Sequence, residues 1–573
     1  MATIRDDELI TSTSARETIQ IQLPDGVVLE GPRGAKLESF INGISSPEVP
    51  IVGAIVDWEL RELTYSINRD AEVRFVTMSE PDGMRIYRRS LTFLLAAAFD
   101  ELFPEAKLYV DHSISSGGYF CRVVDREALD ESELSTLEKR MQVIVEEDLA
   151  FEKSQVPLDE AIEYFKKKAY IDKARLLAHR RKHHLVLYRL GNMQDYYHGY
   201  MVPSAGYLKW FRLVQIGDGF TLCFPRRHRP TTLNDPPQIP RLLKTFRLYG
   251  DWLKNLGISS VGALNDAITV GMSRKVVLVS EAMHDRQITE IAAQIYARKE
   301  VIRIVLIAGP SSSGKTTFSK RLSIQLLARG LSPVPIELDN YFVDRKKTPR
   351  DETGEYDFES IEALDLERLN NDLVLLIQGK KVQLPKYDFR TGLQELGDQV
   401  RLREGELLIL EGLHGLNPEL ARGVDHTQTF RIYASALTQL NLDRFNRVST
   451  TDTRLLRRIV RDAKQRGYSA AETIRRWESV RRGEKRYIFP YQDNADVMFN
   501  SALVYEGSAL APLAEPLLRQ VPFRSNAHIE AKRLLTFLEW LLPIDTDLIP
   551  DDSILREFIG GSILKQFTAW RRP

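Results

Sequence analysis

The stretch IVLIAGPSSSGKTTFSK, residues 304–320, decides the fold of this chain. It opens with a continuous apolar run that ends in glycine, as a buried parallel β-strand does, and it closes with the apolar spacing of a helix. Between the two, Gly309, Gly314, Lys315 and Thr316 fit the pattern GxxxxGK[ST]. Glycines let backbone amides surround phosphate oxygens, and a helix N-terminus adds positive potential. The stretch therefore predicts a loop that binds nucleotide phosphates.

Apolar runs recur after this loop and alternate with helical patterns. Three of them predict further strands: SPVPIEL at 332–338, ELLILEG at 406–412 and TFRIYAS at 429–435. This alternation predicts an α/β domain with a parallel sheet and flanking helices, the architecture of P-loop NTPases. In such a domain Lys315 reaches the terminal phosphates and Thr316 can ligate magnesium. The residues expected to bind ATP are Gly309, Pro310, Ser311, Ser312, Ser313, Gly314, Lys315, Thr316 and Thr317.

Two acidic residues are expected at the edge of the sheet that carries the phosphate loop, one after a strand and one at the end of a strand. Asp339 comes just after the second predicted strand, where a carboxylate can accept a proton from an attacking hydroxyl or lie beside the metal. Capping of a helix is the alternative role for Asp339. Glu411 ends the third strand, where magnesium needs a carboxylate, and a structural role is the alternative there.

A helical segment further on is rich in arginine. The run DTRLLRRIVRDAKQRG, residues 452–467, predicts a helix. Distributed guanidinium charge downstream of a phosphate loop favours a lid that closes on the transferring group and stabilises its developing charge. A solvated basic helix face is the alternative. The arginines concerned are Arg454, Arg457, Arg458, Arg461 and, beyond them, Arg466.

Five motifs make residues 300–510 resemble the uridine kinase and phosphoribulokinase family: GPSSSGKTT, LDNYF, YDF, LPKYDF and LEG. The resemblance implies transfer of a phosphoryl group from ATP or GTP, with Mg²⁺, to a hydroxyl of a nucleoside. It implies Asp339 as the base. The other residues to which it assigns roles are Lys315, Arg458 and Arg461 in catalysis, Tyr341, Asp357, Tyr387 and Arg466 at the acceptor, and Thr316 and Glu411 at the metal.

Three positions depart from the pattern with which uridine kinases read the base. Gly392 stands where the family has a histidine, Tyr468 where it has a lid arginine, and Arg476 where it has a glutamine. The phosphate chemistry is therefore expected to be intact while the acceptor is open. Another sugar alcohol or a phosphosugar is the alternative acceptor.

The N-terminal part carries a second resemblance. IQLPDGVVLE, in a β-rich stretch, is similar to the TGS domain, a β-grasp module. IYRRSLTFLLAAAFDELFPEAKLYV and YYHGYMVPSAGYLKWFRL resemble the second additional domain of threonyl-tRNA synthetases, an α+β editing domain. Where that domain carries its editing His and Cys residues, this chain has Arg89, Phe93, Tyr197 and Met201. Metal-dependent or histidine-dependent editing is thereby excluded.

The resulting division predicts five parts: a TGS-like domain at 17–79, a synthetase-editing-like domain at 80–229, a helical connector at 230–298, a P-loop kinase domain at 299–510 and a C-terminal helical extension at 511–573. The extension holds the run SILREFIGGS, residues 553–562, whose paired glycines indicate a tight backbone feature.

The charge composition and a pair of histidines indicate which binding partners are expected. Lys plus Arg and Asp plus Glu both number 79, so a polyanionic partner needs a local basic site. His179 and His183 are predicted at helical spacing beside Arg180, Arg181 and Lys182; a metal site, an RNA-binding face and a solvated helix face are the alternatives. An RNA-binding regulator switched by nucleotide is therefore the rival function.

The remaining features suit an ordinary soluble protein. The chain of 573 residues is 43% hydrophobic and has no apolar run long enough to cross a bilayer. Its two cysteines, Cys121 and Cys223, lack metal-binding spacing and suit a reducing compartment. We expect a cytoplasmic protein with no membrane partner, and a homo-oligomer is compatible with the sequence.

Overall fold

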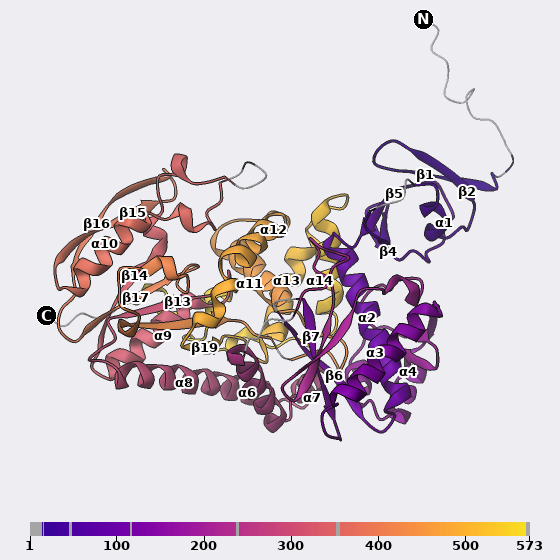
Figure 1. The fold of residues 1–573 in the computed structure, drawn as a ribbon, viewed down its shortest axis with the longest axis horizontal. Coiled ribbons are helices and arrows are strands. Elements are labelled where there is room, and N and C mark those ends of the chain that lie inside the picture. Colours follow the sequence, from indigo (N-terminus) through magenta and orange to yellow (C-terminus); the bar gives the residue numbers. More distant parts are fainter. Residues whose placement is uncertain are drawn as a thin grey trace, which may run out of the picture.

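The computed structural model describes residues 14, 16–44, 48–114, 117–235, 240–350, 354, 356–438 and 440–568. A small β-rich module lies at one end of the molecule and a parallel sheet flanked by helices at the other (Figure 1). The α/β fold class and the two mixed N-terminal regions predicted from the sequence are confirmed.

The first module is a mixed five-stranded sheet in the order β2-β1-β5-β3-β4, and one short helix packs on it. Strand β1 pairs parallel with β5, while the other pairs are antiparallel. The turn between β1 and β2 holds Gly26 at a φ of 87°, a conformation that favours glycine. Ile19, Ile21 and Leu37 are buried beneath the sheet. The elements are β1 (Thr18–Gln22), β2 (Val28–Pro32), α1 (Leu37–Ile41), β3 (Ile51–Val56), β4 (Glu59–Arg61) and β5 (Ala71–Thr77).

The second region combines a four-stranded and a three-stranded antiparallel sheet with helices. Helix α2 is almost entirely buried along its apolar run. Helix α3 begins with a capping box between Asp130 and Glu133, which satisfies N–H groups at its first turn. The elements are α2 (Pro81–Leu102), β6 (Lys107–Ile114), β7 (Gly118–Val124), α3 (Glu131–Glu146), β8 (Glu152–Pro157), α4 (Leu158–Lys167), α5 (Ile171–Ala178), β9 (His184–Leu190), β10 (Met193–Asp195), β11 (Arg212–Ile216) and β12 (Gly219–Cys223).

Three helices cover the stretch expected to be a helical connector: α6 (Pro240–Leu256), α7 (Val261–Thr269) and α8 (Ser273–Ala297). They share one hydrophobic core with the parallel sheet and with the C-terminal helices. The hydroxyl of Tyr249 on α6 donates to the carbonyl of Ala502 across this core at 3.1 Å. These helices are therefore packed against the parallel sheet rather than strung between two units.

The parallel sheet has the strand order β14-β17-β13-β18-β19, with every pair parallel. All four predicted apolar runs are strands in it. Its strands are β13 (Ile304–Ala308), β14 (Ser332–Glu337), β17 (Glu406–Gly412), β18 (Thr429–Ser435) and β19 (Val497–Asn500). The other elements of this part are the hairpin of β15 (Lys381–Asp388) and β16 (Leu393–Arg401), and the helices α9 (Lys315–Ala328), α10 (Leu366–Ile377), α11 (Thr450–Gln465), α12 (Ala470–Tyr487), α13 (Glu506–Arg519), α14 (Asn526–Leu538) and α15 (Arg556–Ile559).

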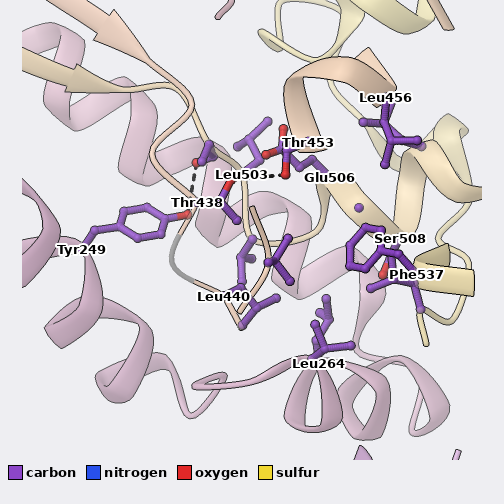
Figure 2. A pocket seen from close by; sticks show the side chains of 17 residues that line it. Tyr249, Leu264, Thr438, Leu440, Thr453, Leu456, Leu503, Glu506, Ser508 and Phe537 are labelled. Carbon is purple, nitrogen blue, oxygen red and sulfur yellow. Dashed lines mark hydrogen bonds between the residues drawn. The ribbon is translucent and has the colours of Figure 1, made fainter. Parts of the chain in front are cut away.

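A small cavity of about 40 Å³ lies in the shared core, where the helices before the sheet meet those after it (Figure 2). Its walls are mostly apolar. Among the residues that line it, the hydroxyl of Thr438 donates to the hydroxyl of Thr453 at 3.2 Å. Pockets that hold drug-sized ligands measure roughly 300–1,000 Å³. The cavity is too small for a nucleoside and marks a packing junction.

The predicted helical spacing of His179 and His183 is wrong. Helix α5 ends at Ala178, and His179 is its C-cap residue. The Nε2 atom of His179 lies 2.7 Å from Oδ1 of Asp266, while Arg180 lies over the ring of Trp540. Across the described ranges, no group of three metal-ligating side chains is found. No helix among the described residues is long and apolar enough to cross a membrane.

Candidate active site

The phosphate loop joins β13 to α9 in the predicted place. Its glycines are required by close packing, because a Cβ on Gly309 would lie 1.9 Å from the carbonyl oxygen of Ala434. Gly314 has a φ of 83° and directly precedes α9. Lys315 begins the helix and donates from Nζ to the carbonyl of Pro310 at 3.2 Å. The loop therefore presents the orphan N–H groups of a helix start, which favour an anion.

Two arginines expected on a lid are instead buried supports of this loop, which corrects that prediction for Arg454 and Arg457. Arg454 donates from Nε to the carbonyl of Ser311 at 2.8 Å and forms an ion pair with Glu484. Glu484 also accepts the N–H of Ser311 at 2.9 Å.

Arg457 is fully buried and lies deeper. It donates from Nε to Glu506 at 2.8 Å and from Nη1 to the carbonyl of Ser312 at 3.4 Å. The hydroxyl of Ser501 donates to the carbonyl of Ser313. Three successive residues of the loop are thus held by side chains from α11, α12 and the segments around β19.

The remaining arginines of the predicted lid lie closer to solvent. Arg458 donates from Nη1 to the hydroxyl of Ser311 at 2.8 Å and pairs with Asp462 at 3.3 Å. Arg461 pairs with the same carboxylate at 2.8 Å. Arg466, whose side chain is 52% exposed, lies 3.8 Å from it. Asp462 therefore gathers three guanidinium groups beside the loop.

The expected metal-binding pair is brought together. The hydroxyl of Thr316 donates to Oε2 of Glu411 at 3.1 Å. Burial raises the pKa of Glu411 to about 7, with Glu557 and Asp339 adding to the effect, while Lys315 opposes it. A hydroxyl and a carboxylate oxygen are hard ligands that suit Mg²⁺. These two residues fit the predicted ion.

Asp339 lies in a 3-10 turn, Leu338–Tyr341, which directly follows β14. Its side chain is open to solvent on one side, yet the protein around it desolvates the carboxylate and raises its pKa. Glu337 raises the pKa further, whereas Lys315 and Arg466 lower it. Asp339 is therefore near the loop lysine and near Arg466.

The residues expected at the acceptor differ in burial and in their partners. Asp357 accepts from the hydroxyl of Tyr487 at 3.3 Å. Tyr387 is buried, and its ring packs against Phe342 and Phe389 at 5.6 and 5.0 Å between ring centroids.

Tyr341 belongs to the same buried cluster as Tyr387 and Phe342. Tyr341 is fully buried and donates to Asp372 on α10 at 3.0 Å, because its ring fills the core under the 3-10 turn.

The three departures from uridine kinases have local explanations. Gly392 has a φ of 75° in the turn between β15 and β16, and its carbonyl accepts the N–H of Arg345 at 2.8 Å. The guanidinium of Arg476 lies over the ring of Tyr468 at 4.3 Å. Tyr468 and Arg476 therefore form a pair with each other.

Glu359 was missed by the sequence reasoning. Burial raises its pKa to about 7, and Glu484 adds to this, while Arg458 and Lys315 lower it. Within the described part of the chain its Oε2 atom is buried without a hydrogen-bond partner. The only signal in the sequence was its place directly after the YDF motif.

The C-terminal run SILREFIGGS was also missed as part of this site. The carboxylate of Glu557 accepts the N–H of Thr317 at 3.0 Å. Ile554 packs against the loop so closely that a Cβ on Gly314 would lie 2.4 Å from it. The tight backbone feature expected of the paired glycines is present, since Gly560 and Gly561 have φ values of 84° and 75°. The C-terminal segment thus lies against the start of α9.

A parallel sheet with a phosphate loop after β13 and with carboxylates after β14 and at the end of β17 defines a P-loop phosphotransferase domain. Residues 304–505 match the model of the Phosphoribulokinase / Uridine kinase family, and this part of the chain is a kinase domain of that family.

The N-terminal third resembles threonine–tRNA ligases. The ligase of Thermotoga neapolitana is 31% identical over 204 residues, which cover 35% of this chain and 31% of the ligase. That of Laribacter hongkongensis is 34% identical over 203 residues, with 35% and 32% covered. The chain spans about a third of the length of the curated relatives that it matches.

Among solved structures, a protein described as a possible uridine kinase from Bacillus stearothermophilus is 24% identical, with 37% of this chain and 98% of that chain covered and a TM-score of 0.23. The D-glycerate 3-kinase of Cryptococcus neoformans is 15% identical, with 50% and 92% covered and a TM-score of 0.19.

Proposed function

We propose that this chain is a kinase that transfers the γ-phosphoryl group of ATP, or of GTP, to a hydroxyl of a nucleoside. The observation that carries the proposal is the position of Asp339. This carboxylate follows β14 at the sheet edge that bears the phosphate loop, and the positive charge of Lys315 acts on it. A base beside the transferring phosphoryl group serves a kinase and has no role in a nucleotide switch alone.

Each side chain of the site has a part in this reaction. The N–H groups at the start of α9 and Lys315 hold the phosphates, and Asp339 accepts the proton of the attacking hydroxyl. Arg458 and Arg461 stabilise the charge that develops on the phosphoryl group. When bound, Mg²⁺ neutralises part of the phosphate charge, and Thr316 and Glu411 would hold it. The raised pKa of Asp339 makes it a better proton acceptor than an ordinary aspartate.

The proposal is tested with a panel of acceptors that contains nucleosides, sugar alcohols and phosphosugars, with labelled ATP or GTP and Mg²⁺. We expect turnover with at least one nucleoside. Asp339→Asn is expected to remove turnover while nucleotide binding stays within about twofold, because the phosphate contacts are unchanged. Asp398→Asn on the exposed strand β16 is the matched control and is expected to keep full activity.

Two outcomes would contradict the proposal. Turnover that survives in Asp339→Asn rejects the base assignment, and a panel in which only sugar alcohols or phosphosugars react rejects the nucleoside as acceptor.

A further inference from the structure

Four basic side chains gather where the synthetase-like region meets α12. They are Arg88 on α2, Arg447 in the segment before α11, and Arg481 and Lys485 on α12, and we call them the basic cluster. None of them belongs to the kinase site described above.

Aromatic rings place two members of the basic cluster together. The guanidinium of Arg88 lies over the ring of Phe224 at 4.5 Å, and that of Arg447 lies over the ring of Tyr119 at 4.7 Å. The two rings pack edge to face with centroids 4.7 Å apart. Arg88 and Arg447 are therefore joined through one aromatic pair, although the chain separates them widely.

Arg481 and Lys485 lie on the face of α12 that is turned toward the segment of Phe224. Glu478, Arg481 and Lys485 are three and four residues apart in turn, so they share one face of the helix. Arg227, three residues beyond Phe224, forms an ion pair with Glu478. This pair ties the face of α12 to the segment that carries the ring under Arg88.

The carboxylates that act on the basic cluster form their ion pairs with other arginines: Glu478 with Arg227, Glu484 with Arg454 and Asp452 with Arg533. No carboxylate of the described residues forms an ion pair with any of its four members. The Nε atoms of Arg88 and Arg447 are buried, and neither finds a hydrogen-bond partner within the part that the structure describes. Arg481 has a hydroxyl as partner, Thr451 Oγ1 at 2.6 Å.

The mutual repulsion is visible at Lys485. Although solvent reaches this side chain, desolvation lowers its pKa to about 8, and the positive charges of Arg481, Arg227 and Arg88 lower it further, while Glu478 opposes them. Desolvation likewise lowers the pKa of Arg88, and Arg481 and Arg447 add to that effect. Bringing like charges together with buried donors unsatisfied is unfavourable unless an anion joins them.

We propose that the basic cluster binds a compact oligophosphate, either free or as the phosphate end of a nucleotide. Guanidinium groups match phosphate oxygens through paired N–H donors, and three of the four members are arginines. The charge of Arg88 interacts with those of Arg447, Arg481 and Lys485, as in a compact group rather than in the stripe that tracks a nucleic-acid backbone. The rings of Phe224 and Tyr119 are covered by guanidinium groups, so they do not offer faces to bases.

The site is separate from the phosphate loop but is connected to it. Lys485 directly follows Glu484, whose carboxylate accepts the N–H of Ser311 in the loop. Because the phosphate loop also binds triphosphate, the test must be made in a chain whose loop is disabled.

The probe is inorganic tripolyphosphate, titrated by calorimetry without Mg²⁺ into a Lys315→Met variant of the full chain. We expect binding to persist there, to weaken with salt, and to fall by about tenfold or more when Arg88→Gln and Lys485→Gln are added. Lys381→Gln on the exposed edge of β15 removes one positive charge, as Lys485→Gln does alone, and as the control it is expected to leave the affinity unchanged.

Further arms separate the sources of the phosphate. Binding of both tripolyphosphate and ATP supports a free or nucleotide-borne oligophosphate, and binding of ATP alone assigns the nucleotide. No binding in the Lys315→Met chain, no effect of the double substitution, or equal binding of an RNA with a 5′-hydroxyl would overturn the proposal. Lys485→Gln alone, at an exposed position, keeps the test valid if the double variant fails to fold.

Discussion

Replacing Glu557 by glutamine is expected to strengthen nucleotide binding. Its carboxylate accepts the N–H of Thr317 in the first turn of α9. The free N–H groups and the dipole of such a helix start attract phosphate. A carboxylate at this point therefore competes with the phosphates of an incoming nucleotide, and it must move aside when they bind.

The magnitude follows from the one contact. A hydrogen bond to a charged group contributes about 1.5–3 kcal/mol, and one between neutral groups about 0.5–1.5 kcal/mol. Glu557→Gln keeps the shape and an acceptor oxygen but removes the charge, so the competitor is weakened by about 1–1.5 kcal/mol. Since about 1.4 kcal/mol corresponds to tenfold in affinity, we expect nucleotide to bind roughly five- to tenfold more tightly.

The assay is calorimetric titration of ATP, with and without Mg²⁺, into the wild type and Glu557→Gln. Glu515→Gln on α13 is the matched control, because Glu515 is a half-exposed carboxylate that pairs only with Arg519 on its own helix among the described residues. Weaker ATP binding by Glu557→Gln would refute the reasoning and assign the carboxylate to the nucleotide site as a ligand contact. An unchanged affinity would refute it as well.

Two further predictions concern stability. Arg457→Met leaves the buried carboxylate of Glu506 without its cation and is expected to lower the free energy of unfolding by about 3–5 kcal/mol in denaturant titrations; a loss below about 1 kcal/mol would contradict it. His112 is stacked between Phe120 and Phe246, and burial lowers its pKa to about 3. Unfolding raises that pKa to about 6.5, so stability is lost as the pH falls below this value. His112→Phe is expected to shrink the loss of stability between pH 7 and pH 5 by about 2 kcal/mol, and an unchanged pH dependence would contradict the buried neutral state.

The phosphate loop and the ends of the strands could be predicted because their signals are local. Gly309 is required by a close backbone contact, and Gly314 is required by its positive φ. Both glycines belong to the loop motif itself, so the motif is recognised from the sequence. Asp339 and Glu411 were placed correctly at one sheet edge because parallel strands carry their carboxyl ends to the same side.

The burial of Arg454 and Arg457 could not be predicted, because it depends on partners far along the chain. Arg454 pairs with a glutamate 30 residues later, and Arg457 with one 49 residues later. In the sequence, these arginines look the same as Arg458 and Arg461, which stay nearer to solvent. Helical periodicity shows which residues share a face, but only the packing of α12 and α13 shows which face is covered.

The packing of the C-terminal run against α9 could not be predicted either, because its partner lies even further away in the sequence. Glu557 meets a backbone N–H that lies 240 residues earlier. Its neighbours are also held by α11, where Lys464 donates to the carbonyl of Ile559 at 2.6 Å and Gln465 to that of Glu557 at 2.7 Å. Paired glycines indicate an unusual backbone conformation, but they do not predict that the segment packs against the start of α9.

The segment between β18 and α11 explains how the synthetase-like region is bound to the kinase domain. Lys173 is fully buried between Asp195 and Asp443, at 3.0 Å from each. Asp443 lies in that segment, whereas the other two lie in the synthetase-like region. A buried charge triad is weak evidence for stability, but one that loses a member leaves an uncompensated buried charge, so it fixes a single docking position. The same segment leads into α11, whose buried arginines hold the phosphate loop, so one continuous stretch of chain joins the synthetase-like region to that loop.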